Sequence, residues 1–274
     1  MPLKIIIKPA SLDSRAFRSA RSLSFACCLW LLAFCSAAPL LAAEPYLAPG
    51  HPDPVALLAP PPAPGSTEEI ADLQEARAVF KARTAAEKER AVKDSGLSFS
   101  LFKAAIGPVF VQTNLPRTAA LLEQVKKEIG VIIDTPKDHW KRKRPYELDP
   151  ELSLGKPEPS FGYPSGHSTR GTVYSMVLAE LFPSSREAIL QVGRNIGWDR
   201  VLIGKHFPTD VQAGRVLGQA IVHELMSSPS FLRDLSQAKA EISRAGSAQL
   251  VQPPQSVSTG KLPTLYRTPE RIAK

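Results

Sequence analysis

The sequence predicts an all-α fold, and three observations lead to this prediction. Apolar residues recur every three to four positions in one segment after another, which is the spacing of an amphipathic helix. Several of these segments open on a capping residue or on a proline that suits a first helical turn. No stretch shows a convincing strand alternation or an internal repeat. Apolar residues make up 43% of the 274 residues, enough for a packed core, so a wholly disordered chain is excluded.

Residues 1–43 have the layout of a secretory signal peptide. A basic stretch precedes an almost uncharged run from Leu23 to Leu41, and the small pair Ala42-Ala43 follows. We therefore expect cleavage before Glu44 and a periplasmic or secreted product. A retained membrane anchor is the alternative, because the apolar run approaches the ~20 residues that a spanning helix needs. A lipoprotein at Cys35 fits less well, because the bulky Phe34 precedes the cysteine.

The leader changes what the composition implies. It contains all three cysteines, Cys27, Cys28 and Cys35, which excludes a disulfide-stapled scaffold and a Cys-rich zinc module. It also contains five basic residues and the acid Asp13, so the formal net charge falls from +8 to +4 when the leader is removed. A dedicated nucleic-acid partner is therefore not expected.

After the leader, we expect a Pro-rich linker over 44–65, an all-α domain over 66–245 and a frayed tail over 246–274. A capping box at Ser66 opens a charged helix that should run to about Lys93.

A second helix, interrupted near Gly107-Pro108, is expected over 99–111. Pro116 suits the first turn of a third helix, which should end at Pro136. A loop then runs to Pro164. Further helices are expected over 168–181, 184–203, 208–226 and 229–243.

Three short segments concentrate the charged and polar residues. The first runs from Lys137 to Pro145, and five of its residues are Lys or Arg, including Arg144. Taken alone, it is typical of a solvated basic run or a nucleic-acid patch.

The second segment, Phe161 to Ser168, opens a predicted helix. Gly166 lets the backbone approach a ligand closely, and the free N–H groups of a helix start favour an anion. His167 at that place can deliver a proton to a bound group. A plain turn with a polar helix cap fits equally well.

The third segment runs from Arg200 to Asp210. Pro208 suits the first turn of the next helix, so Asp210 lies in that turn and can fold back to His206. A carboxylate on one imidazole nitrogen fixes the tautomer and leaves the other nitrogen free as a nucleophile. A helix cap beside a surface histidine is the commoner outcome for such a spacing.

Metal and nucleotide sites fit less well. The run from Gly197 to Lys205 resembles a P-loop, but His206 stands where Ser or Thr is required. His223-Glu224 begins like a zinc-protease helix, but Ser227 replaces the second histidine. The histidines and acids of the three segments lie among Lys and Arg, which repel a cation and attract an anion.

Together, the three segments resemble one family closely. Lys-x6-Arg-Pro, then Pro-Ser-Gly-His, then Arg-x5-His-x3-Asp is the signature of the type 2 phosphatidic acid phosphatase superfamily, which includes the vanadium haloperoxidases. The wording Gly-Tyr-Pro-Ser-Gly-His, and Gly197-Trp198 before the third segment, are similar to the class A bacterial non-specific acid phosphatases. The resemblance covers about two thirds of the chain, from Ile70 to Met226, and implies that family's helical bundle.

The resemblance implies a metal-independent acid phosphatase, without a cofactor, that hydrolyses a broad range of phosphate monoesters through a phosphohistidine. His206 would be the nucleophile, Asp210 would orient it, and His167 would be the general acid. The phosphate ligands that it implies are Lys137, Arg144, Ser165, Gly166, His167 and Arg200. Small-molecule phosphate monoesters are the expected partners, and self-association is common among such relatives, so a homo-oligomer stays open.

One position departs from the family, because Asp199 stands where a serine is usual. Asp199 would either orient Arg200 through a salt bridge or repel the phosphate. We expect an adjusted rate or substrate preference, not a loss of activity.

Three other functions stay open. A lipid or isoprenoid phosphate phosphatase is the nearest, although no apolar span of ~20 residues follows the leader. A vanadium haloperoxidase would share the anion site, but the chain looks short for one. A non-catalytic polyanion-binding protein would use the basic run but leave the two histidines unexplained. The loop from Tyr146 to Ser160 is expected to meet the leaving group.

Overall fold

The computed structural model describes residues 44–110 and 115–251. The expected signal peptide and most of the expected tail lie outside these ranges. The chain divides into two compact units, Met1–Glu44 and Pro45–Lys274, and the second contains every element described below. Each regular element in the described ranges is a helix, so the all-α prediction is confirmed.

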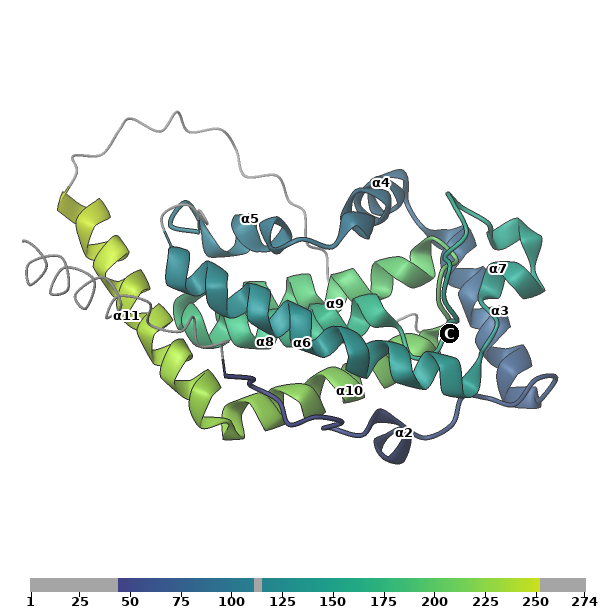
Figure 1. Ribbon diagram of the computed structural model, residues 1–274. Coiled ribbons are helices and arrows are strands. Elements are labelled where there is room, and N and C mark those ends of the chain that lie inside the picture. The colour runs from purple at the N-terminus through teal and green to yellow at the C-terminus, as the bar shows by residue number, and fades with distance from the viewer. Residues whose placement is uncertain (1–43, 111–114, 252–274) are drawn as a thin grey trace, which may run out of the picture. The chain divides into compact units, whose positions relative to one another are not determined.

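Three helices form the centre of the fold. They are α8 (Gly166–Leu181), α9 (Arg186–Leu202) and α10 (Pro208–Ser227), and α8 packs most extensively against the other two (Figure 1). α6 (Pro116–Trp140) lies along α8, and α11 (Pro229–Val251) crosses α6 and α10. α11 continues past residue 245, where we expected the domain to end.

Aliphatic side chains fill the space between these helices. Ile133, Val177, Ile196 and Leu217 belong to one cluster and are almost completely buried. Burying a side chain of this size contributes roughly 1.5–3 kcal/mol.

Small residues bring α8, α9 and α10 unusually close. A methyl group at Gly214 would lie 2.6 Å from the carbonyl oxygen of Ser165, and one at Gly171 would lie 2.8 Å from that of Gly193. Only glycine fits such approaches. They fix the start of α8 against the start of α10, where two of the chemical segments lie.

The helix expected from Ser66 to Lys93 is two helices. α3 (Thr67–Ala82) ends at Arg83, and α4 (Ala85–Lys93) begins with Thr84 as its cap. The Thr84 hydroxyl accepts the amide of Glu87, and the Glu87 carboxylate accepts the amide of Thr84. This second capping box specifies the break that apolar spacing alone missed.

The helix expected over 99–111 ends at the predicted interruption near Gly107, and residue 111 lies outside the described residues. It consists of η2 (Phe99–Phe102) and α5 (Lys103–Ile106), and Gly107 ends it in a left-handed conformation with φ of 97°. The turn η1 (Asp94–Gly96) precedes it, at the predicted break.

α6 does not end at Pro136. It continues for one more turn to Trp140 and ends where Lys141 adopts a left-handed φ of 50° and donates its amide to the Lys137 carbonyl. A proline inside a helix loses one hydrogen bond, and here the packing of Ile132 and Ile133 in the core offsets that loss. Lys137 therefore lies on a helix and not in a loop.

The expected loop from residue 137 to Pro164 also contains two short helices, α7 (Pro145–Leu148) and η4 (Pro150–Leu152). The short helix η5 (Pro183–Ser185) precedes α9.

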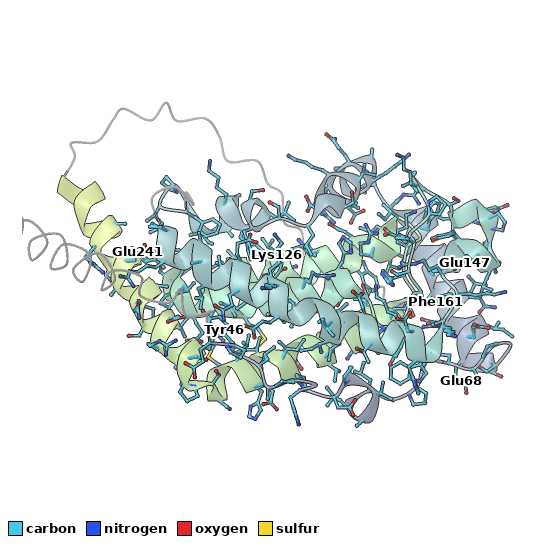
Figure 2. All side chains as sticks on the ribbon, in the orientation of Figure 1. Tyr46, Glu68, Lys126, Glu147, Phe161 and Glu241 are labelled. Atoms are coloured by element: carbon cyan, nitrogen blue, oxygen red, sulfur yellow. The ribbon has the colours of Figure 1, made fainter. Side chains whose placement is uncertain are left out.

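The Pro-rich segment before α3 packs against the helices instead of acting as a free spacer. The amides of Tyr46 and Leu47 donate to the Glu128 carboxylate on α6, and the Tyr46 hydroxyl donates to Asp234 on α11 at 2.8 Å. A short helix, α2 (Pro54–Leu57), follows. Tyr46 is labelled in Figure 2 beside these helices.

Candidate active site

The three chemical segments meet at one end of the central helices. Each predicted residue lies near the end of a helix or in the segment next to one. These are the last turns of α6 and α9 and the starts of α7, α8 and α10. The side chains that come together are Lys137 on α6, Arg144 before α7, Ser165 and His167 at the start of α8, Arg200 on α9, His206 before α10 and Asp210 in its first turn.

Arg144 is the centre of this cluster. Its guanidinium donates to three backbone carbonyls, those of Ser160 at 2.9 Å, Phe161 at 3.1 Å and Lys205 at 2.8 Å. Its Nη1 also lies 3.2 Å from Nε2 of His206. The position of the guanidinium is therefore fixed before any ligand binds. Phe161 is labelled in Figure 2.

His206 and Asp210 form a buried pair across the first turn of α10. Nδ1 of His206 lies 3.2 Å from Oδ2 of Asp210, which also accepts the Phe207 amide at 3.0 Å. The ring nitrogen that faces Arg144 is Nε2, so a neutral ring with its proton on Nδ1 satisfies both contacts.

The electrostatic surroundings keep the His206 ring neutral. Burial, together with Arg144, Arg200 and Lys137, holds the pKa of His206 well below its usual value. Burial raises the pKa of Asp210 to about 6, although Arg142 opposes this rise.

A second buried arginine supports Asp210. Nη1 of Arg142 donates to Oδ1 of Asp210 at 2.5 Å, and Nη2 donates to Asp72 on α3 at 2.8 Å. Asp72 also accepts the Thr209 hydroxyl and amide. The sequence analysis missed Asp72 and Arg142 because their partners lie far away in the chain.

One signal for Arg142 was present in the sequence. Residues 141–144 belong to no helix, and the burial of their side chains alternates along the chain. Arg142 and Arg144 are buried, and Lys141 and Lys143 are exposed. The basic run is therefore a one-sided strip and not a uniformly solvated face.

Arg200 is paired with Glu158, a residue that the sequence analysis did not single out. Nη2 of Arg200 donates to Oε1 of Glu158, which lies on the loop before α8. Arg200 is 3% exposed and Glu158 is 30% exposed. Although burial opposes it, Arg200 and Arg144 hold the pKa of Glu158 below its usual value.

Lys137 points toward the same loop. Its Nζ donates to the Ser160 hydroxyl at 3.1 Å and lies 3.9 Å from Asp134. Burial and Arg144 lower the pKa of Lys137. Lys137, Arg144 and Arg200 therefore form a group of buried cations, which is a strong attractor for an anion.

The start of α8 lies beside these cations. The Ser165 hydroxyl accepts the Ser168 amide at 3.4 Å and caps the helix, and the Ser165 amide donates to the Asp210 carbonyl at 3.0 Å. A methyl group at Gly166 would lie 3.6 Å from Nζ of Lys137. The open side of Gly166 therefore faces the cationic group.

His167 is held by a contact from η1. Its Nε2 lies 3.1 Å from the Ser95 carbonyl, which can only accept, so this nitrogen carries a proton and Nδ1 is the atom left for proton exchange. Burial and Arg200 lower the pKa of His167 to about 4, while Ser95 and Glu158 oppose that shift.

Asp199 does not pair with Arg200. It is 1% exposed and binds Arg90 on α4, with Nη2 of Arg90 at 2.7 Å from Oδ1. Burial raises the pKa of Asp199 in spite of this partner. Of the two outcomes expected for Asp199, the salt bridge to Arg200 is therefore not formed, and the aspartate anchors α4 instead.

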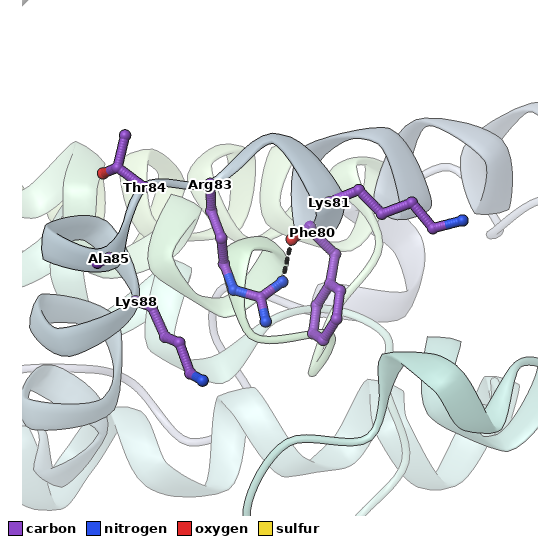
Figure 3. A pocket seen from close by; sticks show the side chains of 6 residues that line it. All are labelled: Phe80, Lys81, Arg83, Thr84, Ala85 and Lys88. Carbon is purple, nitrogen blue, oxygen red and sulfur yellow. Dashed lines mark hydrogen bonds between the residues drawn. The ribbon is translucent and has the colours of Figure 1, made fainter.

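Three further observations concern a second hollow, metal binding and membrane-spanning helices. A hollow of about 300 Å³ at the break between α3 and α4 is lined by Phe80, Arg83 and Lys88, and it contains no predicted site residue (Figure 3). Over the described ranges, no group of three or more His, Cys, Asp or Glu side chains is arranged to bind a metal. No helix in those ranges has the length and apolar character needed to cross a bilayer.

Comparison with known proteins identifies the family. The sequence profile of the PAP2 superfamily matches residues 123–233, which include all three segments. An acid phosphatase of Zymomonas mobilis is 31% identical over 204 residues, which cover 71% of this chain and 77% of the relative. The chain belongs to the PAP2 superfamily. The relationship expected from the three segments is thus confirmed.

The comparisons found two further similar proteins. A non-specific acid phosphatase of Providencia stuartii is 29% identical over 202 residues, covering 70% of this chain and 82% of the relative. A transmembrane PAP2 type phosphatidylglycerolphosphate phosphatase from Bacillus subtilis aligns with a TM-score of 0.47 and 20% identity, over 64% of this chain and 89% of that chain. The expected enzyme class, a phosphoric monoester hydrolase of the acid phosphatase type, matches the names of the first two relatives.

Proposed function

We propose that this PAP2 protein is an exported acid phosphatase that hydrolyses phosphate monoesters through a phosphohistidine at His206. The observation that carries the proposal is the contact of 3.2 Å between Nε2 of His206 and Nη1 of Arg144, inside a group of three cations. A nucleophile and its anion-binding group are thereby adjacent and preorganised.

Substrate binding would use the cations first. A phosphate monoester carries nearly two negative charges, and Lys137, Arg144 and Arg200 supply three positive ones. The Ser165 hydroxyl and the amides at Gly166 and His167 add neutral donors. Phosphoryl transfer depends mainly on positioning and on charge stabilisation, which this set supplies.

The first chemical step forms a bond between Nε2 of His206 and phosphorus and breaks the bond from phosphorus to the ester oxygen. Asp210 holds the Nδ1 proton, so it fixes the tautomer and stabilises the positive charge that develops on the ring. Arg142 keeps Asp210 in place.

His167 would donate its proton to the departing ester oxygen, which then leaves as an alcohol. In the second step His167 accepts a proton from water as the water oxygen attacks phosphorus, and the bond to His206 breaks to release phosphate. Because the pKa of His167 is lowered to about 4, the protonated ring that this step needs is populated at acid pH.

Export rests on the leader alone. Residues 1–43 have a basic start, an apolar run and a small-residue end, so we propose cleavage before Glu44 and a periplasmic or secreted enzyme. Cell fractionation and N-terminal sequencing of the mature protein test this. Retention of residues 1–43 in the membrane fraction would contradict it.

Release of phosphate from p-nitrophenyl phosphate in the presence of EDTA tests the activity and the absence of a metal cofactor together. We expect full turnover with EDTA and inhibition by vanadate. Activity that returns only when a metal is added would contradict the mechanism. A screen of nucleotides, sugar phosphates and aryl phosphates would then measure the breadth of substrates.

A further inference from the structure

A hollow of about 430 Å³ is lined in part by His167. Its walls come from η1, α6 and α8, and the residues that line it are Ser95, Leu97, Glu123, Lys126, Lys127, His167, Arg170 and Tyr174. None of the predicted phosphate ligands other than His167 takes part in it. Lys126 is labelled in Figure 2 on α6.

The charge of this hollow is strongly positive. Lys126, Lys127 and Arg170 line it, and Glu123 is the single acid among its lining residues. Glu123 pairs with Lys126 at 2.9 Å. Among the described residues, no carboxylate pairs with Lys127 or Arg170, so two cations face the hollow without an acid partner.

Arg170 connects the hollow with the cationic group. It lies one helical turn after Gly166, and its Nη1 would be 3.0 Å from a methyl group at that glycine, while Nζ of Lys137 would be 3.6 Å from the same point. Burial is the main cause of the lowered pKa values of His167 and Lys137, and Arg170 adds to both shifts. Arg170 therefore lines the hollow and also lies beside the proposed phosphate ligands Gly166 and Lys137.

We propose that this hollow, which we call the second anion subsite (Lys126, Lys127 and Arg170), binds a second phosphate carried by the leaving group of the substrate. The proposal rests on the proposed function, because it assigns the hollow to the alcohol that His167 protonates. The preferred substrates are then bisphosphates and related phosphorylated monoesters, and plain alkyl or aryl phosphates react without this added contact.

The physical reason is the lack of an internal acid partner. Lys127 is exposed to solvent and Arg170 is partly exposed. Lys127 and Arg170 have no acid to give up when a ligand binds, so a phosphate in the subsite gains charge-assisted hydrogen bonds at little competing cost. A hydrogen bond to a charged group contributes enough to change affinity by about tenfold. A neutral leaving group would form no ion pair with Lys127 or Arg170.

The experiment compares butanediol bisphosphate with hydroxybutyl phosphate and carboxybutyl phosphate, which share a chain but differ in the terminal group. We expect kcat/KM for the bisphosphate to exceed that for hydroxybutyl phosphate by about tenfold or more at low salt, with the carboxylate in between. A second arm presents a bisphosphate headgroup on phosphatidylcholine vesicles. Faster cleavage there identifies a lipid as the source, and faster cleavage of the free bisphosphate identifies a soluble substrate.

Variants separate the subsite from the site of transfer. Lys127→Gln should lower the preference for the bisphosphate about tenfold, with p-nitrophenyl phosphate hydrolysis within about twofold of the wild type, and Arg170→Gln should lower the preference by a similar factor. Lys88→Gln removes a cation from the other hollow and should leave the preference unchanged. A loss on p-nitrophenyl phosphate as large as on the bisphosphate would place Arg170 among the ligands of the transferred phosphate and overturn the subsite.

Binding distinguishes failure of the subsite from failure of the proposed function. The His206→Ala variant should bind butanediol bisphosphate more tightly than hydroxybutyl phosphate by calorimetry, and Lys127→Gln should remove the difference in that background. Equal binding of the two compounds would refute the subsite even if the enzyme hydrolyses p-nitrophenyl phosphate. A binding preference without any hydrolysis would support the subsite and refute the phosphatase mechanism.

Discussion

The carboxylate of Glu158 pairs with the guanidinium of Arg200. One of the three cations proposed to bind phosphate is therefore already paired with an acidic side chain of the protein. Glu158 belongs to the loop between Tyr146 and Ser160, which also contacts Arg144 and Lys137 through Ser160. The loop therefore contributes a competitor for the phosphate as well as a wall.

Removing this competitor should tighten anion binding. In Glu158→Gln we expect the inhibition constant of inorganic phosphate to fall by about 3- to 10-fold, because phosphate no longer has to displace a carboxylate from Arg200. The matched control is Glu151→Gln, an exposed acid in the same loop. Competitive inhibition with p-nitrophenyl phosphate measures the effect, and weaker phosphate binding in Glu158→Gln would show that Glu158 helps to hold the site together.

The pair of Arg90 and Asp199 should be important for stability. Arg90→Ala leaves a buried carboxylate without its cation, and we expect it to lower the free energy of unfolding by about 2–4 kcal/mol at pH 7. Asp199 has a raised pKa in the folded state, so its charged form disfavours folding, and stability should fall further as pH rises.

Urea unfolding at pH 5 and pH 7 measures this prediction. The Arg90→Ala variant should lose less stability at pH 5, where Asp199 can take up a proton. The double variant Arg90→Leu with Asp199→Ser should recover most of the loss, because no unpaired charge remains. An equal loss at both pH values would argue against the buried carboxylate as its cause.

The pH dependence of turnover should reveal His167. Its pKa is lowered to about 4 in the free enzyme, so the proton needed by an alkyl leaving group is lost as pH rises above that value. We expect kcat/KM for an alkyl phosphate to fall on the alkaline side, after correction for the ionisation of the substrate. His206 must be unprotonated to attack phosphorus, and burial and the neighbouring cations lower its pKa, so we expect it to set the acid limb of the profile.

The variant His167→Ala tests that assignment. It should lose about 10²–10⁴-fold on alkyl phosphates and much less on p-nitrophenyl phosphate, whose leaving group needs little protonation. Glu158→Gln should move the alkaline limb to lower pH, because Glu158 raises the pKa of His167. Equal losses on both substrates would count against His167 as the general acid.

Local sequence signals predicted the central helices well. The proline at position 208 and the apolar spacing of α8, α9 and α10 located these elements. Pro136 misled the prediction because packing of the preceding turn outweighed the loss of one hydrogen bond. The break at Thr84 was missed although its capping box is written in the sequence.

Long-range partners were beyond such reasoning. Asp72 and Arg90 lie on polar helices that look solvent-exposed in the sequence, yet each meets an ion partner far along the chain. Glu158 lies in a loop without any periodicity. The separation between such residues is set by the packing of whole helices, so no spacing rule reveals them.

The central claim is that phosphorus is transferred to Nε2 of His206. The direct measurement is rapid quenching of the enzyme with a ³²P-labelled monoester, followed by mapping of the labelled peptide. We predict an acid-labile, base-stable label on the peptide that contains His206, formed as fast as the alcohol is released. Folded His206→Ala protein should carry no label and show no turnover. A label on another residue, or turnover retained by His206→Ala, would contradict the mechanism.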